Sequence, residues 1–265
     1  MIERKTLRIF FAVEKALFLR ELNMSISVGK VGLFWTFFEP FFQVLLFVAL
    51  HTAIRGYSSG ESSSSSSYDY AVFMASGFIA FNMYRNIVNS ASGAFIANQG
   101  LFIYKQVKPI DTILARAMIS IFITSIITSI FLFVGFILEY DIVPKNILMV
   151  LFAYAWLSIF AFSFGLIVAI GNTFYASVGK LINLISFPLL IFSAIFYPLV
   201  SLPAFAQEIL LYNPIIHFME MIHGYYLVGL DDRFVDYRYI ALWTIALLFI
   251  GTWLYRKLQA KIISI

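Results

Sequence analysis

The chain has 265 residues and a net charge of +4; 62% of its residues are hydrophobic and only 12% are charged. Because an ordinary soluble domain has about 25% charged residues, this chain has too few polar side chains to cover a soluble surface. The composition indicates an integral membrane protein and excludes a large soluble catalytic domain. The absence of cysteine excludes disulfides, thiolate metal sites and cysteine nucleophiles.

The predicted fold class is an all-α integral membrane protein, because about six stretches approach the roughly 20 apolar residues that a helix needs to cross a bilayer. The first of them begins near Val31, too late for a cleavable signal peptide. We expect one transmembrane domain over 1–265, with an amphipathic segment at 1–30, a six-span region at 31–257 and a tail at 258–265. The predicted spans are 31–54, 71–94, 112–138, 146–170, 181–197 and 239–254.

The segment 3–22 has the apolar period of a helix that lies in a membrane interface. Glu14 falls on its apolar side and interrupts the pattern. Two interpretations stay open: the helix only anchors the chain, or its cations collect an anionic substrate. The apolar side contains Leu7, Phe10, Phe11, Leu17 and Phe18, and the cations are Arg4, Lys5, Arg8, Lys15 and Arg20.

A carboxylate, Glu39, lies inside the first predicted span, next to Pro40. A charge in the middle of a span costs about 3 kcal/mol on insertion scales, so Glu39 should face protein or water. Pro40 permits a bend, because it removes a helical hydrogen bond. The alternatives for Glu39 are a structural ion pair, with Arg85 of the second span as its candidate partner, and a direct role in substrate binding.

The stretch 98–111, between the second and third spans, is long for a connection and mixes apolar with basic residues. A short amphipathic segment of this kind suits docking onto a partner protein, and the alternative is a passive interfacial loop. Pro109 and Asp111 favour the start of the next helix, since proline fits the first helical turn and an acidic residue complements the positive end of the helix.

The apolar stretch between the fifth and sixth spans is broken by Pro198, Pro203 and Pro214. Because proline ends or kinks a helix, we expect two short re-entrant helices here, and a seventh full span is the alternative. The first helix should begin at Pro203, with Ser201 as a candidate cap. The second should begin at Pro214, with Asn213 as its cap.

The distribution of charge predicts the orientation of the chain. With the N-terminus placed in the cytoplasm, most of the 18 lysine and arginine residues fall on the inside, as the positive-inside rule requires. Acidic residues gather on the opposite side. We therefore expect both termini in the cytoplasm.

Motifs for catalysis and nucleotide binding are absent. The sequence has no G-x-x-x-x-G-K-[ST] loop, so the chain cannot cradle ATP by itself, and it has no H-E-x-x-H or G-x-S-x-G motif. His217 and His223 are six residues apart, which does not stack them on one helix face, so no metal site is predicted. A membrane-embedded chain offers no exposed domain for nucleic acid. A channel, a transporter subunit or a scaffold remains, and an integral-membrane enzyme is the least supported class.

Several short pieces occur in a characteristic order: Trp35-Thr36-Phe37-Phe38-Glu39-Pro40-Phe41-Phe42-Gln43, Ala97-Asn98-Gln99-Gly100-Leu101, Val107-Lys108-Pro109-Ile110-Asp111 with Ala115-Arg116, Ser201-Leu202-Pro203, and Tyr212-Asn213-Pro214 with His217. On these pieces the chain resembles the membrane-spanning subunits of ABC-type polysaccharide exporters, the KpsM/Wzm group, and most of all the capsular polysaccharide permeases of Gram-negative bacteria. The likeness covers nearly the whole chain, although the serine-rich loop at 58–67 departs from it.

The resemblance implies a partnership and a cargo. Members work as a dimer of permeases with two copies of a separate ATPase, so ATP and Mg would bind that partner and no cofactor is expected in this chain. The cargo would be a lipid-linked, commonly acidic capsule polymer in the bacterial inner membrane. A periplasmic adaptor and an outer-membrane export channel would receive it. The alternatives are an O-antigen or teichoic-acid exporter of the same architecture, and a non-transporting membrane scaffold.

The resemblance also implies roles for residues. Contact with the ATPase and coupling to it are expected at Asn98, Gln99, Gly100, Phe102, Tyr104, Lys105, Lys108, Pro109, Asp111 and Arg116. Substrate entry and the conduit are expected at Arg4, Lys5, Arg8, Lys15, Arg20, Trp35, Phe38, Glu39, Phe42 and Arg85. The aromatic members of that set either stack on sugar rings or form ordinary packing surface. The re-entrant region is expected at Pro203, Asn213, Pro214 and His217.

Overall fold

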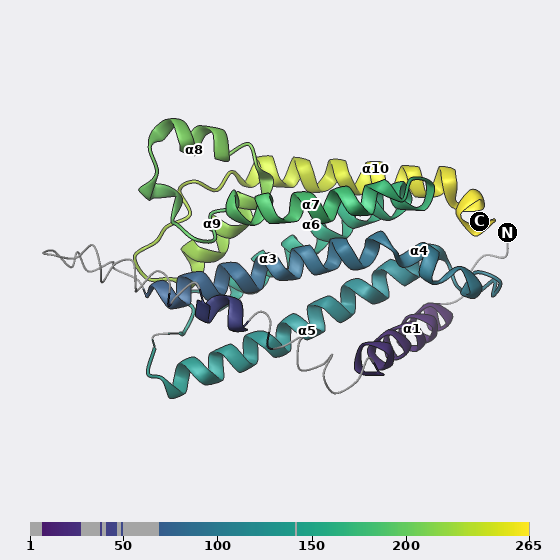
Figure 1. The fold of residues 1–265 in the computed structure, drawn as a ribbon, viewed down its shortest axis with the longest axis horizontal. Helices are drawn as coiled ribbons and strands as arrows, with labels where there is room; N and C mark the ends of the chain where they lie inside the picture. Colours follow the sequence, from purple (N-terminus) through teal and green to yellow (C-terminus); the bar gives the residue numbers. More distant parts are fainter. Residues whose placement is uncertain are drawn as a thin grey trace, which may run out of the picture.

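The computed structural model describes residues 7–27, 38, 41–46, 49, 69–140 and 142–264. Over these residues the chain is helical and has no strand, which confirms the predicted all-α class. Figure 1 shows the long helices running side by side along one axis. The helices are α1 (Leu7–Ser27), α3 (Tyr70–Ser92), α4 (Ala94–Ala97), the 3-10 turn η1 (Gln99–Leu101), α5 (Pro109–Ile137), α6 (Ile147–Phe174), α7 (Ser177–Ile191), the 3-10 turn η2 (Leu199–Ser201), α8 (Ala204–Leu210), α9 (Pro214–Tyr226) and α10 (Tyr237–Ile263).

The centre of the bundle is α3, which packs against α5, α6, α7 and α9 (Figure 1). Its large apolar side chains, such as Phe73, Phe78 and Phe81, are almost fully buried. By contrast, α5, α6 and α10 keep many exposed apolar side chains, and among the described helices these three are long and apolar enough to cross a membrane. The apolar helix α7 is shorter, and the first predicted span, 31–54, lies mostly outside the described residues.

Side-chain caps define where several helices begin. The backbone N–H of Lys108 donates to the carboxylate of Asp111 over 2.7 Å, and Pro109 occupies the first turn of α5. Asn213 accepts a hydrogen bond from the N–H of Ile215 at the start of α9. Both arrangements satisfy backbone donors that a helix leaves free at its N-terminus, and both confirm the predicted helix starts.

The break between α7 and α9 differs in detail from the prediction. Helix α7 ends at Ile191, six residues before the predicted end of the fifth span. Ala194 has a φ of 56°, a left-handed conformation in which a helix cannot continue. Ser201 is not the cap of the next helix: α8 follows Pro203, and the Ser201 hydroxyl donates to the carbonyl of Pro198.

The helices within this break are short. α8 has 7 residues and α9 has 13, whereas a straight span needs about 20. The alternative of a seventh full span would need one continuous helix of that length, and the described helices in this stretch are shorter.

The loop after α9 folds back tightly onto that helix. A Cβ atom added at Gly224 would lie 2.9 Å from the backbone carbonyl carbon and oxygen of Asp231. Gly229, with a φ of 98°, allows the chain to reverse in between. The loop 227–236 is therefore held against α9 by backbone packing.

Replacing Gly224 by alanine should lower the unfolding temperature of the purified chain, because the new methyl group meets backbone that cannot move aside. We expect a cost of about 1–3 kcal/mol, as for other overpacked sites. Gly93→Ala is the matched control, since nothing lies within 4 Å of the added Cβ. Equal thermal unfolding of the two variants would contradict this packing.

Candidate functional site

At the end of the bundle that contains α4, helix α1 lies beside α5 (Figure 1) and is connected to it and to Asn98 by polar side chains. The Arg20 guanidinium donates to the side-chain oxygen of Asn98. The Nε atom of Arg116 in α5 lies 3.4 Å from the carboxylate of Glu21, and its Nη1 atom donates to the carbonyl of Ser90 over 2.7 Å. These contacts connect α1, the end of α3, and α5 through charged and polar groups.

The stretch 98–111 separates into a buried scaffold and an exposed tip. Asn98 is buried and donates to the carbonyl of Ala94, and Phe102 is only 7% exposed within a cluster that includes Ile113 and Tyr255. The tip is Ile103–Gln106, in which Ile103 is 82% exposed and Tyr104 is 64% exposed, with Lys105 and Gln106 also at the surface.

Among the predicted coupling residues, Asn98, Phe102, Pro109 and Asp111 are therefore inside the fold. Gly100, Tyr104 and Lys105 lie on its surface, while Gln99, Lys108 and Arg116 are half-buried. The sequence prediction includes the buried Phe102 and omits the exposed Ile103.

A groove of about 430 Å³ lies between α1 and the stretch 98–111. Its walls are mostly apolar, and Arg20, Tyr104 and Gln106 provide polar groups. Glu14 turns inward and is buried, which explains why it falls on the apolar side of α1. The groove is lined by Ile9, Ala12, Val13, Ala16, Leu17, Arg20, Leu101, Tyr104, Gln106 and Val107.

At the other end of the bundle, polar residues of α9 and its cap make hydrogen bonds to the segment 192–213, which separates α7 from α9, and to the loop after α9. Asn213 donates through its amide to the carbonyl of Phe192 and to the hydroxyl of Ser193. The Nε2 atom of His217 lies 2.9 Å from the carbonyl of Leu211, and its Nδ1 atom lies 3.1 Å from the N–H of Asp236. The Nδ1 atom also lies 3.1 Å from the carbonyl oxygen of Phe234.

Glu220 makes the third contact of this kind. Its carboxylate accepts a hydrogen bond from the N–H of Leu199 in η2, at 3.2 Å. Asn213, His217 and Glu220 are spaced four and then three residues apart, which places them on one side of α9. The sequence reasoning identified Asn213 and His217 but missed Glu220, which this helical spacing could have revealed.

Burial raises the pKa of Glu220 from 4.5 to about 7, and Asp231 adds to the rise, while the Leu199 hydrogen bond and Arg233 act in the opposite direction. Beyond this segment, Asp232 in the loop accepts hydrogen bonds from the hydroxyls of Tyr237 and Tyr225, which hold the pKa of that carboxyl below its ordinary value.

Between the two ends, a cavity of about 250 Å³ lies against α3, α6, α7, α10 and the N-terminus of α9. Arg85 and Tyr84 of α3 contribute to its wall.

Of the other predicted conduit residues, Arg8, Lys15 and Phe42 are exposed, and the Phe38 and Phe42 rings stack with centroids 5.5 Å apart. Arg4, Lys5, Trp35 and Glu39 lie outside the described residues.

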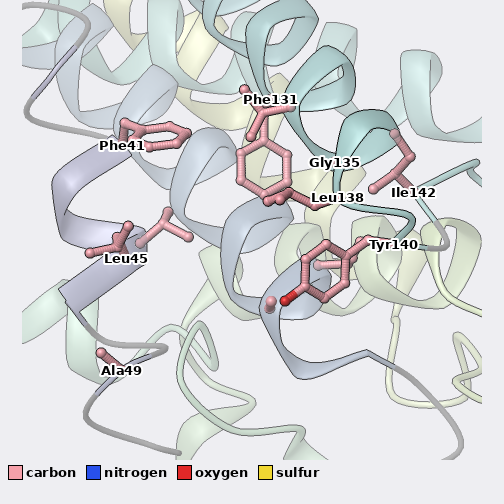
Figure 2. A pocket seen from close by; sticks show the side chains of 12 residues that line it. Phe41, Leu45, Ala49, Phe131, Gly135, Leu138, Tyr140 and Ile142 are labelled. Carbon is pink, nitrogen blue, oxygen red and sulfur yellow. The ribbon is translucent and has the colours of Figure 1, made fainter.

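Figure 2 shows a second cavity, between Phe41, Leu45 and Ala49 on one side and the end of α5 on the other. Its volume is about 240 Å³. Phe41 and Leu45 face Phe131 and Leu138 across it, and Tyr140 supplies its polar group. None of the described residues that line it is an acid, a base or a cation, so we assign it no chemistry. The described part of the chain also contains no group of His, Cys, Asp or Glu residues suited to a metal ion.

Replacing Glu220 by glutamine should reduce the pH dependence of stability. The folded chain retains the Glu220 proton between the ordinary pKa and about pH 7, so stability falls as the pH rises through that window and the loss is complete above it. Glutamine can still accept from Leu199 but carries no charge.

The drop in unfolding temperature between about pH 5 and about pH 8 should therefore be smaller in Glu220→Gln than in the unmodified chain. Glu208→Gln, at an exposed position on α8, is the control and should keep the original drop. An unchanged drop in both variants would argue against a buried, strained carboxylate at position 220.

Comparison with known proteins gives one family and several relatives. The ABC-2 type transporter family matches residues 13–227. The chain is 32% identical over 259 residues to the polysialic acid transport protein KpsM of Escherichia coli, covering 96% of this chain and 98% of KpsM. It is 30% identical over 252 residues to the capsule polysaccharide export inner-membrane protein BexB of Haemophilus influenzae, covering 94% and 91%.

A third relative extends the same pattern. The capsule polysaccharide export inner-membrane protein CtrC of Neisseria meningitidis serogroup A is 28% identical over 236 residues, covering 89% of this chain and 87% of CtrC. The family match covers most of the chain, and three described helices are long and apolar enough to cross a membrane. The chain therefore belongs to the ABC-2 type transporter membrane family.

Proposed function

We propose that this chain is the membrane-spanning subunit of an ATP-driven exporter that moves a lipid-linked capsular polysaccharide across the bacterial inner membrane. The observation that carries the proposal is its end-to-end similarity to KpsM and BexB, whose names describe polysialic acid transport and capsule polysaccharide export. The bundle of long apolar helices suits the membrane part of such a machine.

The proposed partners rest on the similarity to capsule export proteins of the ABC-2 type family. ATP and Mg would bind two copies of a separate cytoplasmic ATPase, in agreement with a sequence that has no phosphate-binding loop. A second copy of this chain would complete the conduit, and a periplasmic adaptor and an outer-membrane export channel would take the polymer onward.

We propose six spans with both termini in the cytoplasm, a membrane-surface position for α1, and re-entrant positions for α8 and α9. The basic residues near both ends of the chain support this orientation. The short lengths of α8 and α9 support a segment that enters the bundle and returns. The hydrogen bond between Glu220 of α9 and the backbone of Leu199 supports the same arrangement.

We propose that the ATPase docks on the exposed tip Ile103–Gln106 and in the groove beside α1. The apolar groove walls and the exposed Lys105 suit an apolar surface with acidic neighbours. Arg20 joins α1 to Asn98 at the start of the stretch 98–111, and Arg116 joins α5 both to α1 and to α3. A displacement of the tip would therefore reach the long helices through these contacts. Phe102 acts as the buried support of the tip.

The double substitution Tyr104→Ala with Lys105→Glu should weaken ATPase binding several-fold, because it removes the exposed ring and reverses the charge of the tip. The amount of ATPase that co-purifies with the tagged chain measures this effect. Phe133→Ala, at an exposed position on the span α5, is the control. Full co-purification of the double variant, at wild-type expression, would contradict docking at the tip.

Deleting the gene in its host should leave capsule polymer inside the cell, because the conduit is lost while synthesis continues. Electron microscopy and fractionation of the polymer check this, and the unmodified gene supplied in trans should restore surface polymer. Normal surface capsule in the deletion strain, or a defect confined to the lipopolysaccharide O-antigen, would reject the capsule proposal.

A further inference from the structure

One side of α10 changes from apolar to basic along a single row of side chains, the α10 row. Phe249, Trp253, Lys257 and Lys261 follow one another at intervals of four residues, so each is the neighbour of the next on the helix surface. All four are exposed, Phe249 to 69% and Trp253 to 52%. The α10 row therefore presents hydrocarbon, then an indole ring, then two cations to whatever lies beside the helix.

Two aromatic rings hold the ammonium groups of the α10 row close to the protein. The Lys257 Nζ atom lies 5.1 Å from the centroid of the Trp253 ring, and the Lys261 Nζ atom lies 5.1 Å from the centroid of the Phe174 ring at the end of α6. Such contacts are attractive but neutralise no charge. Because Phe174 belongs to another helix, the second contact places Lys261 at the seam between α6 and α10.

No acidic side chain of these helices balances the two cations. Helices α6, α7 and α10 contain no aspartate or glutamate, and no ion pair within the described residues includes Lys257 or Lys261. Asp111 of α5 is buried and caps its own helix. Two further exposed cations are Arg256, beside Lys257, and Lys180, near the start of α7. This end of the bundle therefore carries positive charge that an anion outside the chain would compensate.

The spacing of the α10 row matches the layers of one membrane leaflet. Helix α10 is long and apolar enough to cross a membrane, and each step of four residues advances about 6 Å along a helix. Tryptophan concentrates at the membrane–water interface. With Trp253 at that level, Phe249 lies at the depth of the hydrocarbon chains, and Lys257 and Lys261 lie at the depth of the headgroups. A phospholipid beside the row would meet matching chemistry along its length.

The position of the α10 row favours a lipid over a protein partner. Figure 1 shows α10 and α1 on opposite sides of the bundle, so the row lies away from the groove beside α1. The side chains that lead up to the lysines are apolar and exposed on a helix of membrane-crossing length, a surface that lipid covers. Basic residues placed directly after such a helix attract anionic headgroups.

We propose that the α10 row is a docking surface for an anionic phospholipid, with Lys257 and Lys261 binding the headgroup phosphate and with Trp253 and Phe249 packing on the acyl chain. This inference goes beyond the proposed function and rests on it in one respect: a cytoplasmic C-terminus assigns the lipid to the inner leaflet.

The test uses the full chain, purified in the complex that it forms, and native mass spectrometry to count bound dioleoylphosphatidylglycerol. Lys257→Gln with Lys261→Gln removes both cations. Because each basic residue near a membrane surface strengthens the binding of anionic lipid about fivefold, affinity should fall about thirtyfold. Lys257→Arg with Lys261→Arg keeps the charge and should keep the binding. Lys145→Gln with Arg238→Gln is the matched control, because it removes two exposed cations at the opposite end of the bundle.

The expected result is preferential binding of phosphatidylglycerol over phosphatidylcholine, reduced only in the Lys257→Gln, Lys261→Gln variant, with unchanged unfolding temperature and unchanged co-purification of the ATPase. Equal loss in the control variant, loss in the arginine variant, or no preference for the anionic lipid would overturn the proposal. Loss of bound ATPase with unchanged lipid binding would overturn it in favour of a protein partner.

Export measurements separate this surface from the proposed function. Capsule export by the unmodified chain, without lipid binding that depends on Lys257 and Lys261, would reject the docking surface and keep the function. Lysine-dependent lipid binding by a chain that exports no capsule would reject the function and keep the docking surface.

Discussion

The structure depends on how the peptide groups between α7 and α9 find partners inside an apolar bundle. An unpaired backbone group in such surroundings costs several kcal/mol, and this segment leaves the helical hydrogen-bond pattern at Ile191. The polar side of α9 supplies the missing partners: Asn213 for Phe192, His217 for Leu211 and Glu220 for Leu199. These hydrogen bonds stabilise one conformation of the segment between α7 and α9.

The two ends of the bundle are joined by long, closely packed helices. At one end, Arg116 ties α5 to the carbonyl of Ser90 in α3 and to Glu21 of α1. At the other end, α3 packs directly against α9, whose N-terminus closes the cavity that Tyr84 lines. In an exporter driven from the α4 end, α3 and α5 are the rigid elements that would carry a displacement toward the broken segment.

Local signals in the sequence predicted what local physics determines. The caps and prolines at Pro109 and Asn213 predicted helix starts correctly, because capping involves residues a few positions apart. The Arg20–Asn98 contact joins residues 78 positions apart, and no local pattern encodes it. Burial within the stretch 98–111 is likewise not encoded locally. The sequence predicts Phe102 as a contact residue, but tertiary packing encloses its side chain and leaves that of Ile103 exposed.

Hydrogen–deuterium exchange at the amide of Leu199 tests most directly whether α9 holds the break together. In the unmodified chain, reconstituted in nanodiscs, this amide should exchange slowly because Glu220 accepts its hydrogen bond. Protection should persist in Glu220→Gln, which keeps an acceptor, and should be lost in Glu220→Ala. Equal protection in all three proteins, or fast exchange in the unmodified chain, would contradict the account.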